Sequence, residues 1–133
     1  MMKFGFIGMG NMGYAMLKGA LNSFSSDEII FTCPSSQRRE YINSETNVAY
    51  AESNAECANN SKYIILAVKP QVYDVVLKNI HDIVSPDNII ISLAPGITID
   101  DLKRKLGNDM RIVRAMPNTP ALVGQGMTGI SYE

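Results

Sequence analysis

The sequence predicts an α/β fold whose core is a doubly wound parallel sheet. Short apolar segments alternate with segments of helical periodicity along the chain, which is the order of strands and crossover helices in such a sheet. The longest unbroken apolar segment, residues 63–68, has no polar face, as expected of a strand that helices cover on both sides. At 133 residues the chain can bury a core of its own, so residues 1–133 are predicted to form one domain.

Strands and helices alternate through the first part of the chain. Apolar segments predict strands at residues 3–7, 28–32 and 47–50. Helical periodicity predicts helices at residues 11–21 and 37–44. Met12, Met16 and Ala20 lie four residues apart and form one face of the first of these helices. Ser53 and Glu56 have the spacing of a capping box, which predicts a further short helix after Ser53.

The alternation continues in the second part of the chain. Strands are predicted at residues 63–68, 88–93, 111–115 and 127–132. Pro70 suits the first position of a helix. The apolar face predicted for that helix consists of Val72, Val75, Val76, Ile80, Ile83 and Val84. A last helix is predicted from Thr98, which has Asp101 three residues later, to Gly107.

Charge and composition exclude several classes of protein. The net charge is −1 and no basic run is longer than Arg38-Arg39, so a nucleic-acid partner is not expected. No apolar segment approaches the ~20 residues that cross a bilayer, so no membrane partner is expected. The two cysteines are too few for a disulfide framework, which favours a reducing, cytoplasmic location.

No catalytic or metal-binding set of side chains is recognisable. His81, the single histidine, is predicted on the solvent side of the helix after Pro70. Cys33 and Cys57 are expected to be inert, and neither has a Cys or His at metal-ligand spacing, so no metal is expected. A protein that mainly orients a cofactor needs few catalytic side chains of its own.

A glycine-rich turn after the first strand is the main candidate for a binding site. Gly8, Gly10 and Gly13 form a GxGxxG pattern between a strand that ends at Ile7 and a helix that begins near Asn11. The first glycine permits a tight turn, the second lets the backbone approach a pyrophosphate, and the third allows close packing of helix on strand. Free N–H groups at the positive helix end would then meet the phosphates of a dinucleotide. The pattern predicts a Rossmann-type site, and the alternative is a turn that binds nothing.

Polar residues follow the second strand, where NAD-binding proteins usually carry an acidic side chain for the ribose hydroxyls. Residues 32–39 contain hydroxyls and the Arg38-Arg39 pair, and the first acid is Glu40. This composition suits a ribose with a 2′-phosphate, so NADP(H) is the predicted cofactor and NAD(H) the alternative. The competing interpretation is a polar loop with a solvated arginine pair.

Unusual residues follow three later strands, at the edge where ligands bind in an open parallel sheet. Lys69-Pro70 places a cation and a helix start after residue 68. Residues 94–96 are small and stiff, and residues 116–120 hold two prolines around polar groups. Each segment is a candidate for ligand contact, and each is also explained as a structural turn.

Three of these segments together resemble pyrroline-5-carboxylate reductase. Residues 4–13 read FGFIGMGNMG, residues 67–70 read AVKP, and residues 114–120 read RAMPNTP. The glycine segment is shared with other dehydrogenases, so AVKP and RAMPNTP are the specific segments. The resemblance implies an NAD(P)-dependent oxidoreductase of proline biosynthesis, which passes hydride to the C=N carbon of Δ1-pyrroline-5-carboxylate and yields L-proline.

The resemblance also implies which residues contact the cofactor. In the family they come from the glycine loop, a serine after the second strand, an asparagine and the AVKP segment. In this sequence they are Ile7, Gly8, Met9, Gly10, Asn11, Met12, Ser35, Asn54, Ala67, Val68, Lys69 and Pro70. One departure is Pro95, where the family usually has alanine before the glycine.

Members of the family continue into an all-helical C-terminal domain that forms the dimer and contributes the substrate pocket. No such domain follows in this sequence, so no catalytic residue is assigned. We expect the chain to bind NADP(H) without turning over by itself, because reaction requires both partners to be held at near-attack distance. A homo-oligomer is expected for a full-length protein that includes that domain.

Two other functions stay open. A hydroxyacid dehydrogenase of the 6-phosphogluconate type or an F420-type NADP oxidoreductase has the same glycine loop. A protein of another class, a non-catalytic NADP(H)-sensing module, would use cofactor binding to change an association surface.

Overall fold

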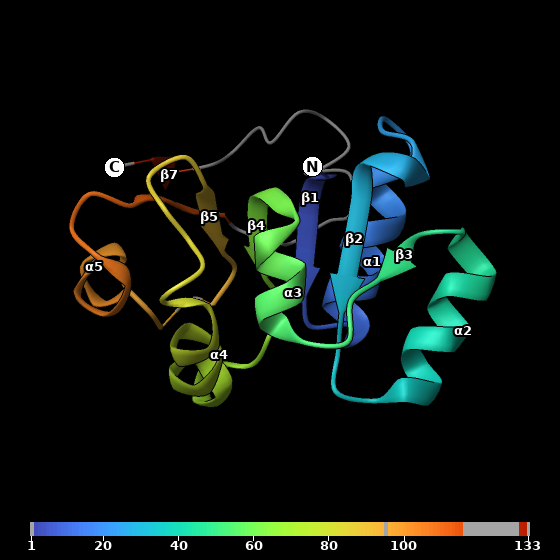
Figure 1. Cartoon of the computed structure of the whole chain (residues 1–133), viewed down its shortest axis with the longest axis horizontal. Helices are drawn as coiled ribbons and strands as arrows, with labels where there is room; N and C mark the ends of the chain where they lie inside the picture. Colours follow the sequence, from blue (N-terminus) through green and yellow to red (C-terminus); the bar gives the residue numbers. More distant parts are fainter. Residues whose placement is uncertain (1, 95, 116–130, 133) are drawn as a thin grey trace.

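Seven strands form one sheet in the order β3-β2-β1-β4-β5-β6-β7 (Figure 1). The computed structural model describes residues 2–94, 96–115 and 131–132. The strands are β1 (Met2–Ile7), β2 (Ile29–Thr32), β3 (Ala49–Tyr50), β4 (Ser61–Leu66), β5 (Ile89–Ser92), β6 (Arg111–Arg114) and β7 (Ser131–Tyr132). Strands β1 to β6 pair in parallel, which confirms the predicted doubly wound parallel sheet.

The last strand of the described sheet runs against its neighbour. β7 pairs antiparallel with β6, with Val113 opposite Tyr132 and Arg114 opposite Ser131. Residues 127–130 of the predicted last strand lie outside the described residues.

The strand order reverses at β1. From β1 the chain adds β2 and β3 on one side, and it then crosses to add β4, β5 and β6 on the other side. Ile7, the last residue of β1, pairs with Thr32 on one side and with Leu66 on the other. In open α/β sheets, ligands bind in the crevice at such a reversal, beyond the carboxyl ends of the strands. The fold therefore directs attention to the residues that follow Ile7 and Leu66.

Helices connect the strands in the predicted order. They are α1 (Asn11–Ala20), α2 (Ser36–Thr46), α3 (Asn54–Asn59), α4 (Tyr73–Ile80) and α5 (Ile99–Leu106), with short 3-10 turns η1 (Ser26–Glu28) and η2 (Pro70–Val72). In Figure 1, α3 lies in front of the sheet and α1 behind it. Because helices cover both faces of the sheet, side chains on both sides of β4 are buried, and this explains the apolar character of the strand.

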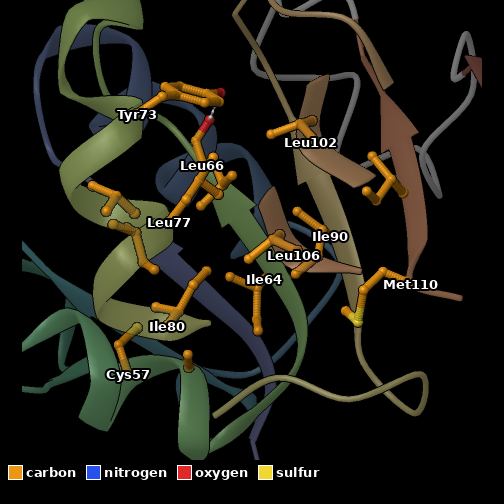
Figure 2. Packing of buried hydrophobic residues seen from close by; sticks show 14 of the residues in the cluster. Cys57, Ile64, Leu66, Tyr73, Leu77, Ile80, Ile90, Leu102, Leu106 and Met110 are labelled. Carbon is orange, nitrogen blue, oxygen red and sulfur yellow. Dashed lines mark hydrogen bonds between the residues drawn. The ribbon is translucent and has the colours of Figure 1, made fainter. Parts of the chain in front are cut away.

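Alternate side chains of the central strands enter two separate cores. Phe4, Phe6 and Ile65 pack with the α1 side chains on one face of the sheet. On the other face, Ile64 and Leu66 pack with the side chains of α3, α4 and α5, as Figure 2 shows. A strand has a side-chain period of two, so β4 supplies both cores from consecutive residues.

The apolar face of α4 differs from the prediction. The buried residues of α4 are Tyr73, Val76, Leu77 and Ile80. Val76 and Ile80 are placed as predicted, but Val72, Val75 and Ile83 are among the exposed large apolar residues, Val75 at 60 %. The chain first forms the 3-10 turn η2, which has about three residues per turn and so rotates the stripe of side chains that faces the core.

In the described part of the chain, side-chain caps begin α2, α3 and α5, and the cap of α3 differs in detail from the expectation. Thr98 and Asp101 form the full capping box of α5. Ser53 accepts a hydrogen bond from the Glu56 N–H at 3.0 Å, as predicted, but the Glu56 carboxylate accepts from the N–H of Glu52 instead of Ser53. No helix of the described residues has the length and apolar character needed to cross a membrane.

Candidate functional site

The turn after β1 depends on a glycine at its first position. Gly8 has a φ of 104°, a conformation that side chains rarely adopt, and its N–H donates to Thr32 O at 2.9 Å. A Cβ atom at Gly8 would lie 2.8 Å from Ala67 O and 2.8 Å from Val68 Cγ1. The predicted tight turn is therefore confirmed, and it lies directly against the segment that follows β4.

The other two glycines of the loop have opposite surroundings. A Cβ at Gly13 would lie 2.4 Å from Gly8 O, so the first turn of α1 packs on the loop with no room for a side chain. A Cβ at Gly10 would meet no atom within 4 Å. Packing explains why Gly13 has no side chain, whereas the open space beside Gly10 is the cradle that a bound group would fill.

The N-terminus of α1 suits an anion. Gly10 is the N-cap, no side chain caps the helix, and its first turn contains no acidic residue. The first N–H groups of a helix have no partner within the helix, and the aligned peptide dipoles place partial positive charge there. Gly10, Asn11 and Met12 are exposed at this end, while Ile7 and Met9 are buried and present only their backbone.

Ser35 begins the helix that follows β2. It is the N-cap of α2 and its Oγ accepts a hydrogen bond from the Arg38 N–H at 3.2 Å. Arg38 in turn reaches the glycine loop, where its Nε donates to Met9 O at 2.8 Å. The structure thus connects Ser35 to the loop through one arginine.

The two arginines are not a solvated pair. Arg38 and Arg39 are both half-buried, and each donates to a backbone carbonyl. Arg39 bonds Cys33 O through Nη1 at 2.6 Å and lies over the Tyr50 ring, 5.7 Å from its centroid. The competing interpretation of a solvated arginine loop is therefore wrong.

The segment after β4 lies directly against the glycine loop. Ala67 is buried and its N–H donates to Ile7 O at 2.8 Å, which joins the ends of β4 and β1. Val68 is half-buried against Gly8, whereas Lys69 and Pro70 are exposed at the start of η2. Four predicted site residues thus follow one another from the buried loop contact to the surface.

Asn54 is held by a different partner. It is the first residue of α3, and its Nδ2 donates to Asn79 Oδ1 of α4 at 3.1 Å. This contact connects α3 to α4, and the contacts that hold the glycine loop do not include it. Pro95 and residues 116–120, which the sequence also nominated, lie outside the described residues.

A buried tyrosine was missed by the sequence analysis. Tyr73 is 2 % exposed, and its hydroxyl donates to Leu66 O at 3.1 Å (Figure 2). The same hydroxyl pairs with Ser92 Oγ at 3.0 Å. Burial raises the pKa of the Tyr73 hydroxyl, so it stays protonated. Its contacts join the carboxyl ends of β4 and β5. The sequence offered one signal for this contact: Tyr73 and Ser92 each place a hydroxyl group within a segment that is otherwise mostly apolar.

We expect Tyr73→Phe to lower the free energy of unfolding by about 1–2 kcal/mol, because Leu66 O and Ser92 Oγ lose a buried partner. Urea unfolding of Tyr73→Phe, Ser92→Ala and the double variant measures this loss. The losses should not add, since both substitutions remove the same hydrogen bond. Tyr41→Phe, at an exposed ring, is the control; strictly additive losses at Tyr73 and Ser92 would contradict the assignment.

The cysteines and the histidine occupy the environments that the sequence indicated. Burial raises the pKa of the Cys57 thiol to about 12, and its Sγ donates to Phe6 O at 3.7 Å. Burial also raises the pKa of Cys33, whose thiol donates to Ser35 O. His81 is exposed and bonds Asp82 at 3.0 Å. Among the described residues no group of His, Cys, Asp and Glu could hold a metal ion.

Two surface hollows lie away from the glycine loop. One, of about 450 Å³, is at the amino ends of the strands and includes Lys62, Asn88 and Arg111 in its lining. The other, of about 410 Å³, lies between α4 and α5 and includes Asp74 and Lys105, which form an ion pair. Neither includes a residue of the predicted site.

Comparison with known proteins places this geometry in context. A sequence family described as NADP oxidoreductase, coenzyme F420-dependent, matches residues 3–96. Pyrroline-5-carboxylate reductase of Escherichia coli is 41% identical over 131 residues, which cover 97% of this chain and 49% of the relative. The same enzyme of Haemophilus influenzae is 37% identical and covers 94% of this chain and 46% of the relative. The chain thus spans about half the length of these curated relatives.

Solved structures agree with the sequence comparison. A pyrroline-5-carboxylate reductase from Coxiella burnetii has a TM-score of 0.83 and 35% identity, over 92% of this chain and 46% of that one. The pyrroline carboxylate reductase of Plasmodium falciparum, solved with NADP bound, has a TM-score of 0.78 and 35% identity, over 92% of this chain and 45% of that one. The resemblance that the sequence motifs predicted is therefore confirmed.

Proposed function

The chain belongs to the family described as NADP oxidoreductase, coenzyme F420-dependent, and we propose that it is the NADP(H)-binding part of a pyrroline-5-carboxylate reductase. The observation that carries the proposal is the 41% identity to the Escherichia coli reductase over 97% of this chain. The site supports it independently, because the glycine loop combines an open backbone position with an uncapped helix N-terminus.

The proposed cofactor runs along the carboxyl edge of the sheet. Its pyrophosphate lies on the backbone between Gly8 and Met12, its 2′-phosphate near Ser35, and its nicotinamide half beyond Ala67. The full set of proposed contact residues is Ile7, Gly8, Met9, Gly10, Asn11, Met12, Ser35, Asn54, Ala67, Val68, Lys69 and Pro70. The absence of a carboxylate from residues 32–39 supports NADP(H) over NAD(H), since an acid there would repel the 2′-phosphate.

The bound nicotinamide would supply hydride to the C=N carbon of Δ1-pyrroline-5-carboxylate, and the ring nitrogen would take a proton to give L-proline. The residues of this chain bind and orient the cofactor and exclude water from its buried edge. We assign no catalytic residue among them. For a full-length protein with a C-terminal helical domain, we propose that this domain completes the substrate pocket and forms a homo-oligomer. We also propose a cytoplasmic location.

Cofactor titration tests the proposal directly. NADPH and NADH are added side by side to the protein, and protein-bound NADPH is followed by its fluorescence. We expect saturable binding of both cofactors, with NADPH at least about tenfold tighter, because a charged hydrogen bond to the 2′-phosphate contributes about 1.5–3 kcal/mol. If neither NADPH nor NADH shows saturable binding, the proposed function is refuted.

A second candidate follows from the description of the matching family, which names coenzyme F420. Assays with pyrroline-5-carboxylate, with a 3-hydroxy acid and with reduced F420 separate the candidates in a protein that contains the whole reductase. NADPH oxidation that depends on pyrroline-5-carboxylate alone supports the first candidate. Hydride exchange between F420 and NADP supports the second.

We expect Ser35→Asp to weaken NADPH binding by about tenfold or more and NADH binding by less than about twofold. The new carboxylate sets a negative charge against the 2′-phosphate, which NADH lacks. Aspartate is also a good N-cap, so α2 is retained. Ser53→Asp, at the N-cap of α3, is the control, and equal losses for the two cofactors would count against the placement of Ser35.

A further inference from the structure

Arg38 is held by contacts from two elements besides its own helix. Its Nε donates to Met9 O in the glycine loop at 2.8 Å, and the bond is partly buried. Its guanidinium carbon lies 5.3 Å from the ring centroid of Tyr14 in α1, an arrangement typical of a cation over an aromatic ring. Tyr14 also packs edge-on against Tyr41 of α2, with 6.4 Å between the centroids. The guanidinium is therefore fixed between α1, α2 and the loop.

The bond to Met9 O has a consequence for the neighbouring N–H. The described chain has no cis peptide bond, so the C=O of Met9 and the N–H of Gly10 point in opposite directions from one planar group. A hydrogen bond that fixes the carbonyl therefore fixes the N–H as well. Gly10 is the N-cap of α1 and has open space beside it, so this N–H belongs to the backbone cradle of the loop.

The rest of the guanidinium remains available. The group carries five N–H donors, and the bond to Met9 O uses the one on Nε. Within the described part of the chain, the terminal nitrogens of Arg38 make no hydrogen bond. The backbone N–H of the same residue donates to the Oγ of the N-cap Ser35, so Arg38 lies one helical turn after Ser35. A planar group with paired donors is well suited to a phosphate.

We propose that Arg38 is a specificity-determining residue with two functions, in which Nε orders the glycine loop for the pyrophosphate and the terminal nitrogens bind the 2′-phosphate. The inference rests on the proposed function and deepens it. One side chain then couples the two phosphate sites of the cofactor. Selection of NADPH and order in the loop become properties of the same residue.

Arg39 offers a matched comparison. It has the same charge and is the next residue, but its Nη1 donates to Cys33 O and its guanidinium lies over Tyr50 of β3. These contacts join the end of β2 to α2 and β3, and none involves the glycine loop. Arg39 thus shares the general electrostatics of Arg38 without its two proposed functions.

Two substitutions separate the two functions of Arg38. In Arg38→Gln the side-chain amide nitrogen occupies the position of the arginine Nε, so a donor to Met9 O is retained while the terminal nitrogens and the charge are lost. In Arg38→Met a chain of similar length has no donor at all. Arg39→Gln is the control, because it removes the same charge one residue away.

NADPH and NADH affinities of the three variants test the proposal. Arg38→Gln should bind NADPH about tenfold more weakly and NADH within about twofold of the parent protein. Arg38→Met should bind NADH about tenfold and NADPH about a hundredfold more weakly. Arg39→Gln should stay within about threefold for both. Thermal melting of each variant shows that it is folded during the titrations.

Each contrary result overturns a definite part of the proposal. NADH affinity of Arg38→Met equal to that of the parent refutes the loop function. NADPH affinity of Arg38→Gln equal to that of the parent refutes the 2′-phosphate function, and an equal loss in Arg39→Gln refutes the assignment to Arg38. If the parent protein binds neither cofactor, the proposed function fails instead, so the two failures are distinguishable.

Discussion

Replacing Gly13 with alanine is expected to lower the free energy of unfolding by about 2 kcal/mol. The new Cβ would lie 2.4 Å from Gly8 O, a backbone atom that cannot move without displacing the turn after β1. Overpacking of this kind costs about 3 kcal/mol, and the better helix propensity of alanine returns about 1 kcal/mol at most. The steric effect is therefore larger than the propensity effect, although the substitution lies within α1.

Urea unfolding measures the stability of Gly13→Ala, and NADPH titration measures its cofactor affinity. Both should fall, because the displaced turn includes the proposed pyrophosphate contacts. A variant that is as stable as the parent protein would show that α1 does not pack on the loop as described.

Replacing Gly10 with alanine is expected to weaken NADPH binding about a hundredfold and to leave the stability of the fold nearly unchanged. The new Cβ meets no atom within 4 Å, and a φ of −70° is an ordinary value for alanine. Alanine is a poorer N-cap than glycine, so we expect stability to change by less than about 1 kcal/mol. The Cβ would, however, occupy the space that the pyrophosphate needs.

The two glycine variants are controls for each other. They lie three residues apart in the same GxGxxG motif, and each adds one methyl group. Equilibrium unfolding and NADPH titration should rank them in opposite orders, Gly13→Ala the less stable and Gly10→Ala folded but unable to bind well. Tight NADPH binding by Gly10→Ala would show that the pyrophosphate does not bind beside residue 10, and it would contradict the proposed site.

Much of this fold was predictable because its signals are local. Gly8, Gly10 and Gly13 mark a strand-turn-helix through the steric needs of a few neighbouring residues. Thr98 and Asp101 mark a helix start through hydrogen bonds within one turn. The alternation of apolar segments with helical periodicity was sufficient to predict the parallel sheet.

The prediction for α4 was wrong, because which residues a helix buries depends on the rotation of the chain where the helix begins. The buried stripe of α4 starts at Tyr73 and not at Val72, because a 3-10 turn precedes the helix and changes the rotation of the chain. β7 is antiparallel to its neighbour, a direction that the sequence analysis left open. Neither property is encoded in the composition of the segment itself.

The sequence by itself determined the class of the fold, the position of the glycine loop and the resemblance to a reductase family, because each depends on residues that are near one another in the chain. Only the tertiary structure decided which residues from distant parts of the chain meet. Met9 and Arg38 are 29 residues apart, and Tyr73 and Ser92 are 19 residues apart, yet a direct hydrogen bond joins each pair. Such pairs form when the sheet brings the ends of its strands together, and no spacing in the sequence specifies them.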